Sequence, residues 1–101
     1  PGGSTIITSV LQCMLNVFEY GMTMQESVSK PRFHHQWLPD DVMFEPKGFD
    51  PMVISKLKAK GYVPKEENFV IIGRVDAILV EKDGSLEGGA DPRGDDVAVG
   101  F

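Results

Sequence analysis

The first twenty residues place apolar side chains at the spacing of an amphipathic helix. One face of such a helix is apolar, since these residues recur at every third or fourth place: Ile6, Ile7, Val10, Leu11, Met14, Leu15, Val17 and Phe18. Ser4 stands where an N-cap residue is expected, and Gly21 stands where a glycine in the left-handed conformation ends many helices. The pattern therefore predicts a helix from about Thr5 to Tyr20 that Ser4 caps.

End signals predict two further helices. Thr23 is a suitable N-cap for a two-turn helix, which Pro31 ends because the residue before a proline is disfavoured in helical geometry. Asp50 followed by Pro51 is a favoured helix opening, and the segment after it has an apolar face and a lysine face until Gly61. We expect a short helix in the first segment and a longer one in the second.

The remaining segments favour extended chain. The stretch 32–41 has no clear period, and 42–45 forms a strand-like run that Pro46 closes. Beyond it, apolar residues recur at about every second position from Phe69 onward, and Lys82-Asp83-Gly84 signals a turn. These patterns predict extended segments at 69–72, 75–80, 85–90 and 97–101, which include an antiparallel hairpin and a terminal strand. Helices followed by antiparallel strands indicate an α+β fold, which we expect to be a single domain over residues 1–101.

Composition and charge limit the classes of partner that the chain can bind. The chain has 101 residues, 42% of them hydrophobic, which is typical of one small globular domain. Its formal charge is −5, whereas nucleic acid and anionic lipid require clustered lysine and arginine. The apolar run 6–20 is too short and too polar to cross a bilayer. The sequence therefore predicts no nucleic-acid partner and no membrane partner.

Gly2 and Gly3 form the first candidate site, because they lie directly before the first predicted helix. Glycines leave backbone N–H groups sterically open, and a helix N-terminus adds unpaired donors and roughly half a positive charge. Such a cradle suits a carboxylate or the oxyanion of an acyl-transfer intermediate. The alternative from local sequence is that the two glycines form an ordinary turn.

Other polar residues form no complete catalytic set. His34 and His35 are adjacent in extended chain and point to opposite faces, so we expect one to be structural and the other to lie at the surface, with no shared metal. The acidic loop 91–96 departs from the EF-hand pattern, and we expect Asp91 and Arg93 to take part in a hydrogen-bonded turn. We predict no metal site and no cofactor.

Four motifs, taken in order, resemble one known family. They are Pro1-Gly2-Gly3-Ser4, the string KPRFHHQWLPD at 30–40, GADPR at 89–93 and AVGF at 98–101. Their order and spacing resemble the C-terminal end of the gamma-glutamyltransferase (gamma-glutamyltranspeptidase) family over essentially the whole chain. The string around His34 is the most specific of the four.

The resemblance implies an N-terminal-nucleophile hydrolase with the αββα fold. In that family a precursor cleaves itself, and the new N-terminal threonine of the small subunit attacks a gamma-glutamyl amide, as in glutathione. This chain resembles the final segment of that small, catalytic subunit. The threonine and the residues that grip the substrate lie upstream in the family, so no nucleophile is expected in this chain.

The resemblance also implies roles for particular residues and for partners. Gly2 and Gly3 correspond to the oxyanion-hole glycines of the family. We expect structural roles, as ion pairs that fix strand ends or as packing against partners, for Arg32, His34, Gln36, Trp37, Asp91 and Arg93. The partners would be the rest of the small subunit, the large subunit and the gamma-glutamyl substrate.

Several expectations concern the isolated chain and the whole protein. We expect the isolated chain to be inactive, and to self-associate or be only marginally stable, because sheet edges and apolar helix faces would be open. The whole protein is expected in the periplasm or outside the cell, as is common in the family. The alternatives are a cephalosporin or glutaryl acylase-like member of the same superfamily, or a non-catalytic interaction module.

Overall fold

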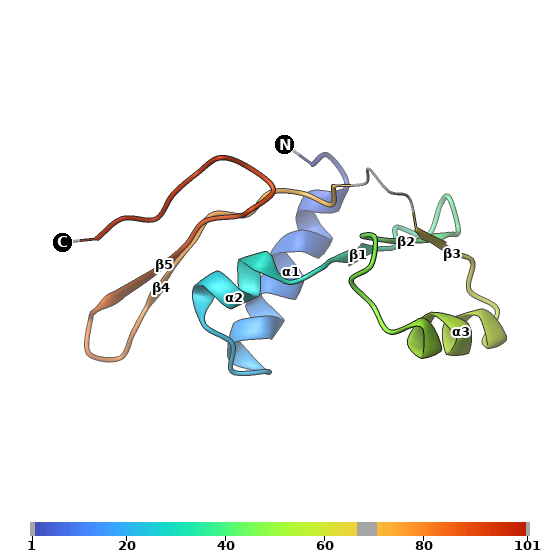
Figure 1. Ribbon diagram of the computed structural model, residues 1–101, viewed down its shortest axis with the longest axis horizontal. Helices are drawn as coiled ribbons and strands as arrows, with labels where there is room; N and C mark the ends of the chain where they lie inside the picture. Colours follow the sequence, from blue (N-terminus) through green and yellow to red (C-terminus); the bar gives the residue numbers. More distant parts are fainter. Residues whose placement is uncertain (1, 67–70, 101) are drawn as a thin grey trace.

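The chain contains both helices and strands, as the sequence predicts. The computed structural model describes residues 2–66 and 71–100. Its elements, in order, are α1 (Thr5–Phe18), α2 (Met24–Ser29), β1 (Phe33–His34), β2 (Val42–Phe44), α3 (Pro51–Ala59), β3 (Pro64–Glu66), β4 (Ala77–Val80) and β5 (Leu86–Gly89). The molecule is elongated, measuring 48 × 26 × 22 Å, with the β4–β5 hairpin at one end and α3 with the small sheet at the other (Figure 1).

Helix α1 ends as its glycine predicts, although two residues earlier than Tyr20. Gly21 has a φ of +67°, and the next amide, of Met22, donates back to the carbonyl of Asn16 over 3.0 Å. The prediction that the Ser4 side chain caps the helix is wrong. Ser4 has helical dihedrals, with φ −64° and ψ −18°, whereas a capping side chain needs an extended residue at that position.

The two shorter helices begin as predicted. The hydroxyl of Thr23 accepts a hydrogen bond from the amide of Glu26, and the carboxylate of Asp50 accepts one from the amide of Met52. These side chains satisfy amides at each helix start that have no partner inside the helix. The prediction of both N-caps is confirmed.

The strands form two small sheets. Strands β1 and β2 are antiparallel, with Phe33 opposite Phe44, whereas β2 and β3 are parallel, with Met43 opposite Lys65. Strands β4 and β5 form an antiparallel hairpin in the second sheet. The expectation of antiparallel strands placed after the helices is therefore wrong in part, because α3 makes a crossover connection that brings β3 alongside β2 in parallel.

Two predicted strands are not confirmed. In the first, 69–72, Phe69 and Val70 lie outside the described residues, and Ile71 and Ile72 are not in a strand. The terminal strand is wrong over its described part, 97–100, which pairs with no other described strand. Alternating apolar residues are therefore insufficient here, since a strand also needs a neighbouring edge to pair with.

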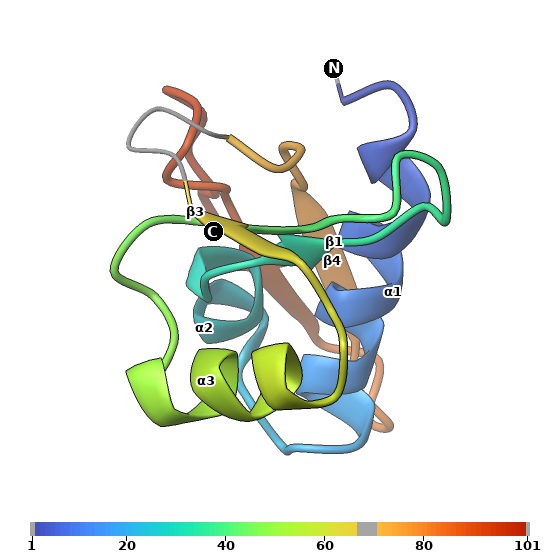
Figure 2. The same cartoon turned by 90° about the vertical axis from the view of Figure 1, so that its right-hand side faces the viewer.

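The alternation predicted in β4 is confirmed, and it defines the core. The side chains of Val75, Ala77 and Leu79 are half-buried against a small cluster on the two N-terminal helices, formed by Cys13, Met24 and Val28. Helices α1 and α2 pack together and lie between the β4–β5 hairpin and the sheet of β1, β2 and β3 (Figures 1 and 2).

A large apolar surface remains open in this chain. On α1 the exposed fraction is 77% for Ile7 and 72% for Phe18, and on the outer face of β4 it is 68% for Ile78. None of the helices in the described part of the chain is long and apolar enough to cross a membrane. The open faces lie on the helix and hairpin that carry the core on their other side.

Candidate functional site

The turn before α1 directs backbone N–H groups away from the helix. The carbonyl of Gly2 accepts a hydrogen bond from the amide of Thr5 over 3.0 Å, and the carbonyl of Gly3 accepts one from the amide of Ile6 over 3.2 Å. A trans peptide directs its N–H opposite to its C=O, so the N–H groups of Gly3 and Ser4 point away from α1. No described residue accepts a hydrogen bond from the amide of Gly2 or Gly3.

Glycine is required at both positions of this turn. Gly2 has a φ of +152° and Gly3 a φ of +55°, which are conformations that other residues rarely adopt. A Cβ atom on Gly2 would also lie 3.0 Å from the Thr5 hydroxyl oxygen and 3.2 Å from a side-chain carbon of Ile6. The two exposed glycines therefore hold open donors at the start of a 14-residue helix, which is an environment that favours negative charge.

A polar network fixes the first turn of α1 to the segment after β1. The Ser4 hydroxyl donates to Oε1 of Gln36 over 2.7 Å, and Nε2 of His34 lies 2.8 Å from the same oxygen. Nδ1 of His34 lies 2.7 Å from the hydroxyl of Thr8, one turn further along the helix. We call these four residues, Ser4, Thr8, His34 and Gln36, the Ser4–Gln36 network.

The network belongs to a longer polar stripe on α1. Ser4, Thr8, Gln12 and Asn16 follow one another at intervals of four, which places them on one face, and each bonds to a residue between 27 and 36. Gln12 both donates to the carbonyl of Phe33 and accepts from its amide. Sequence reasoning missed this stripe, although the four-residue spacing of polar residues in an otherwise apolar helix was the available signal.

The motif residues next to the network differ in burial. His34 is only 3% exposed and is enclosed within this chain, whereas Trp37 is 75% exposed and has a φ of +75°. The ring of His35 points elsewhere and lies 3.0 Å from the carboxylate of the exposed Asp40. The structure therefore separates a buried His34 from a half-buried His35.

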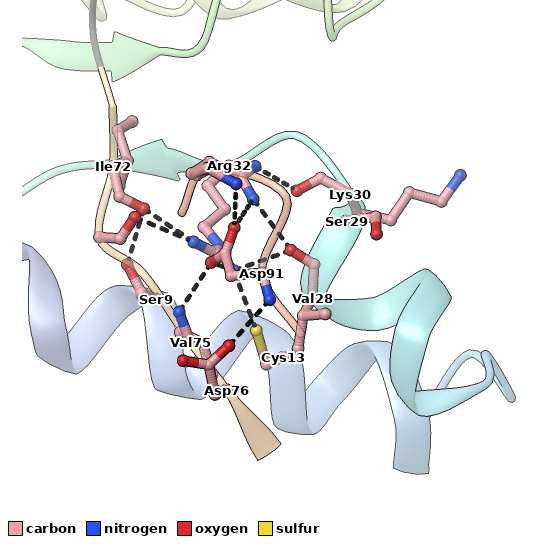
Figure 3. Close-up of polar contacts among 12 residues, drawn as sticks. Ser9, Cys13, Val28, Ser29, Lys30, Arg32, Ile72, Val75, Asp76 and Asp91 are labelled. Atoms are coloured by element: carbon pink, nitrogen blue, oxygen red, sulfur yellow. Dashed lines mark hydrogen bonds and ion pairs between the residues drawn. The ribbon is translucent and has the colours of Figure 1, made fainter. Parts of the chain in front are cut away.

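A second site is a cluster of buried charges centred on Arg32 and Asp91. These two residues are each 1% exposed, and their side chains form an ion pair of 2.8 Å (Figure 3). Arg32 also donates to the carbonyls of Val28, Ile72 and Gly73, while its Nε atom has no partner among the described residues. Arg32 thus connects the end of α2 to the segment that precedes β4.

Arg93 and Glu45 complete the cluster, so two cations face two carboxylates. Nε of Arg93 donates to Glu45 over 2.6 Å, and Nη1 of Arg93 lies 3.0 Å from Asp91. Arg93 also bonds to the carbonyls of Val28 and Lys30 at the end of α2. Sequence reasoning did not identify Glu45, although a carboxylate inside a strand-like apolar run was a signal for a buried partner.

The cluster shifts the ionisation of its members. Burial by itself would raise the pKa of Glu45, but the hydrogen bonds from Arg93 and from two backbone amides hold that pKa below its ordinary value. Burial likewise opposes ionisation of Asp91, and the amides of Arg93 and Val75 together with both arginines hold its pKa low. The same carboxylates outweigh burial and raise the pKa of Arg93.

Gly73 links the charge cluster to the glycine turn. Its carbonyl accepts from Arg32, and its Cα would lie 3.5 Å from a Cβ placed on Gly2. Gly73 has a φ of +70°, and a Cβ there would lie 2.4 Å from the hydroxyl oxygen of Ser9. The buried ion pair therefore supports the backbone against which the turn rests.

The described side chains offer no group of three potential metal ligands among His, Cys, Asp and Glu.

The sequence model of the Gamma-glutamyltranspeptidase family matches residues 1–101. The chain belongs to the gamma-glutamyltranspeptidase family.

Individual family members show the same relationship. The chain is 47% identical to the glutathione hydrolase proenzyme of Escherichia coli (strain K12) over 103 residues, which is all of this chain and 17% of that protein. It superposes on gamma-glutamyltranspeptidase from Pseudomonas nitroreducens complexed with L-DON with a TM-score of 0.87 and 34% identity, covering 100% of this chain and 52% of that one. The chain therefore spans about a sixth of that proenzyme and half of that solved chain.

A related enzyme outside the gamma-glutamyltranspeptidases has a similar fold. Cephalosporin acylase from Bacillus halodurans is 25% identical with a TM-score of 0.77, covering 93% of this chain and 18% of the acylase. The gamma-glutamyltranspeptidase neighbours are N-terminal-nucleophile hydrolases. The segment thus occurs in enzymes named for different substrates.

Proposed function

We propose that this chain is the final segment of the small, catalytic subunit of a gamma-glutamyltranspeptidase or glutathione hydrolase, and that its glycine turn forms the oxyanion hole. The observation that supports this most directly is the open amide of Gly3, which points away from α1 at the start of the helix. The amide of Gly2 is the second donor in this proposal. Neither amide has a partner among the described residues, so both are available to a substrate.

The proposed reaction is acyl transfer through an ester intermediate. A threonine hydroxyl outside this chain attacks the carbonyl carbon of the gamma-glutamyl amide, and the carbonyl π electrons move to oxygen. The oxyanion accepts hydrogen bonds from the glycine amides, then collapses to the ester, and the amine leaves with the proton that the threonine lost. Attack by water or an acceptor amine on the ester forms the oxyanion again, and its collapse releases the threonine, whose oxygen regains a proton from the attacking group. The same donors therefore act twice.

The expected contribution of the turn is large. Removing one oxyanion donor typically costs about 3–4 kcal/mol of transition-state stabilisation, which corresponds to a fall in kcat of about 10²- to 10³-fold. Because both donors are backbone groups, no side-chain truncation removes them. Their test is a substitution that changes the backbone conformation.

The open apolar faces support the proposed partners. The exposed side chains of Ile7, Phe18 and Ile78 belong to the elements that carry the core, and a chain that spans half of its solved relatives lacks the segments that would cover them. We infer that the rest of the small subunit and the large subunit lie on these faces, and that the whole subunit completes an αββα fold. The 101 residues act as one domain within it.

A pair of chromogenic substrates tests the proposed function and its alternative. The full-length protein is expected to release p-nitroaniline from gamma-glutamyl p-nitroanilide faster than from the glutaryl anilide, which lacks the α-amino group. A preference for the glutaryl substrate would instead support an acylase, which the likeness to cephalosporin acylase makes the second candidate. Release from neither substrate would favour an interaction module.

A further inference from the structure

The Ser4–Gln36 network has a fixed donor and acceptor arrangement. Nε2 of Gln36 donates to the carbonyl of Leu38 over 2.8 Å, and a carbonyl can only accept, so the orientation of the Gln36 amide is determined. Its Oε1 atom must then accept from both of its other neighbours, the hydroxyl of Ser4 and Nε2–H of His34. In each of the three contacts of the Gln36 amide, a donor therefore faces an acceptor.

The network closes a ring on the first turn of α1. His34 is buried, and its Nδ1 atom lies 2.7 Å from the hydroxyl of Thr8, which follows Ser4 by four residues on the same helix face. Two points on the helix are thus held by the side chains of His34, at the end of β1, and of Gln36, two residues further along the chain. A ring with two anchors restricts both the position and the rotation of the first helical turn.

Ser4 is the member of this ring that touches the glycine turn. Its amide nitrogen is joined to the carbonyl carbon of Gly3 in one planar peptide, so a fixed Ser4 holds one end of Gly3, the residue that carries the open amide. Its side chain makes no bond to an amide of its own helix, which is the usual stabilising use of a serine at this place. The hydroxyl instead donates a hydrogen bond to Gln36.

We propose that Gln36 is a positioning residue, which acts through Ser4 to hold the glycine turn in the geometry that binds the oxyanion. This inference rests on the proposed function and adds a residue that touches no reacting atom. Small errors of placement in such a site lower the rate, because donors must lie close to where the oxyanion forms. Loss of the ring should therefore lower kcat while substrate binding is kept.

The test uses the full-length protein with two disruptive variants of the ring, one conservative variant and one control. Ser4→Ala and Gln36→Leu are each expected to lower kcat for gamma-glutamyl p-nitroanilide about tenfold, with KM unchanged within about twofold. Ser4→Thr retains a hydroxyl and is expected to restore most of kcat. The control, Gln12→Leu, removes both bonds from the same stripe to Phe33, about two turns from Ser4, and should lower the melting temperature with kcat kept.

Amide hydrogen exchange gives a second readout that does not depend on activity. The amides of Thr5 and Ile6 are bonded to the carbonyls of Gly2 and Gly3, so their exchange reports the integrity of the turn. We expect about tenfold faster exchange there in Ser4→Ala and Gln36→Leu, and no change in Gln12→Leu.

The outcomes separate the two proposals. Unchanged kcat and exchange in Ser4→Ala and Gln36→Leu, with the same loss of melting temperature as in Gln12→Leu, would overturn the positioning role and leave the proposed function intact. Failure of Ser4→Thr to restore kcat would also overturn it. If the unmodified protein releases no p-nitroaniline, the proposed function fails, and the exchange rates alone decide whether Gln36 positions the turn.

Discussion

Replacing Arg32 by methionine tests whether the buried charge cluster stabilises the protein. The substitution removes the 2.8 Å ion pair to Asp91 in a site where both residues are 1% exposed. Three backbone carbonyls also lose a donor. Methionine keeps much of the volume and flexibility of the side chain, so the change is mainly one of charge and hydrogen bonding.

The expected loss follows from the contacts that remain. Removing one partner of a buried ion pair costs about 3–5 kcal/mol, because the other charge stays buried. Asp91 keeps Arg93 and two backbone amides, and the carbonyls of Val28 and Ile72 keep other donors, so only the Gly73 carbonyl loses every donor. These remaining bonds place the loss at the low end, about 3 kcal/mol.

Thermal unfolding of the full-length protein measures this loss. The solved chain of which this one spans 52% lies in the range of 150–250 residues, for which about 2–4 °C per kcal/mol applies, so the melting temperature should fall by about 6–12 °C. Asp40→Asn is the matched control, since it removes the charge of a side chain that is 77% exposed and lies 3.0 Å from His35, and it should change the melting temperature very little. Equal melting temperatures for Arg32→Met and the control would refute the stabilising role of the cluster.

Three further outcomes are expected. Because the pKa values of Glu45 and Asp91 are lowered, the stabilisation from these carboxylates is complete above the ordinary carboxyl pKa, about 4, and is lost as the pH falls through the lowered values. The difference in melting temperature between the unmodified protein and Glu45→Gln should therefore become smaller below that pH, and a constant difference would contradict this. Gly73→Ala should lower the free energy of unfolding by about 2 kcal/mol more than Gly84→Ala, because both glycines have positive φ but only at Gly73 would a Cβ lie against Ser9. Equal losses in thermal unfolding would contradict a cost from that contact. The isolated chain should show no release of p-nitroaniline and should self-associate in size-exclusion chromatography, whereas a stable monomer with a cooperative melt would contradict its dependence on partners.

Local signals predicted the helices and the hairpin well because those elements depend on nearby residues. The caps at Thr23 and Asp50, the left-handed Gly21 and the alternation from Val75 to Val80 act within a few positions of one another. The prediction of a Ser4 cap is wrong, because the Ser4 hydroxyl donates its hydrogen bond to Gln36, a residue 32 positions away. Competition between local and distant partners of this kind is not visible in a local pattern.

The sheet pairing and the charge cluster needed information that the local pattern lacks. The sequence of β3, Pro-Lys-Glu, has no apolar alternation, and its parallel pairing follows from the crossover through α3. Glu45 and Arg93 are 48 positions apart, and only the folded chain shows that they form an ion pair. The glycine turn was identified from its place before a helix, while the side chains that hold it were not.

The most direct test of the oxyanion role compares two glycines of equal conformational demand. Gly3 and Gly21 have φ values of +55° and +67°, and a Cβ at either would meet no atom within 4 Å, but they lie at opposite ends of α1. Valine is strongly disfavoured at positive φ and forces the backbone to change at each site. In the full-length protein, Gly3→Val should lower kcat for gamma-glutamyl p-nitroanilide by about 10²-fold or more while Gly21→Val stays within about threefold of the unmodified rate. An equal, small effect of both substitutions would contradict an oxyanion hole at the glycine turn.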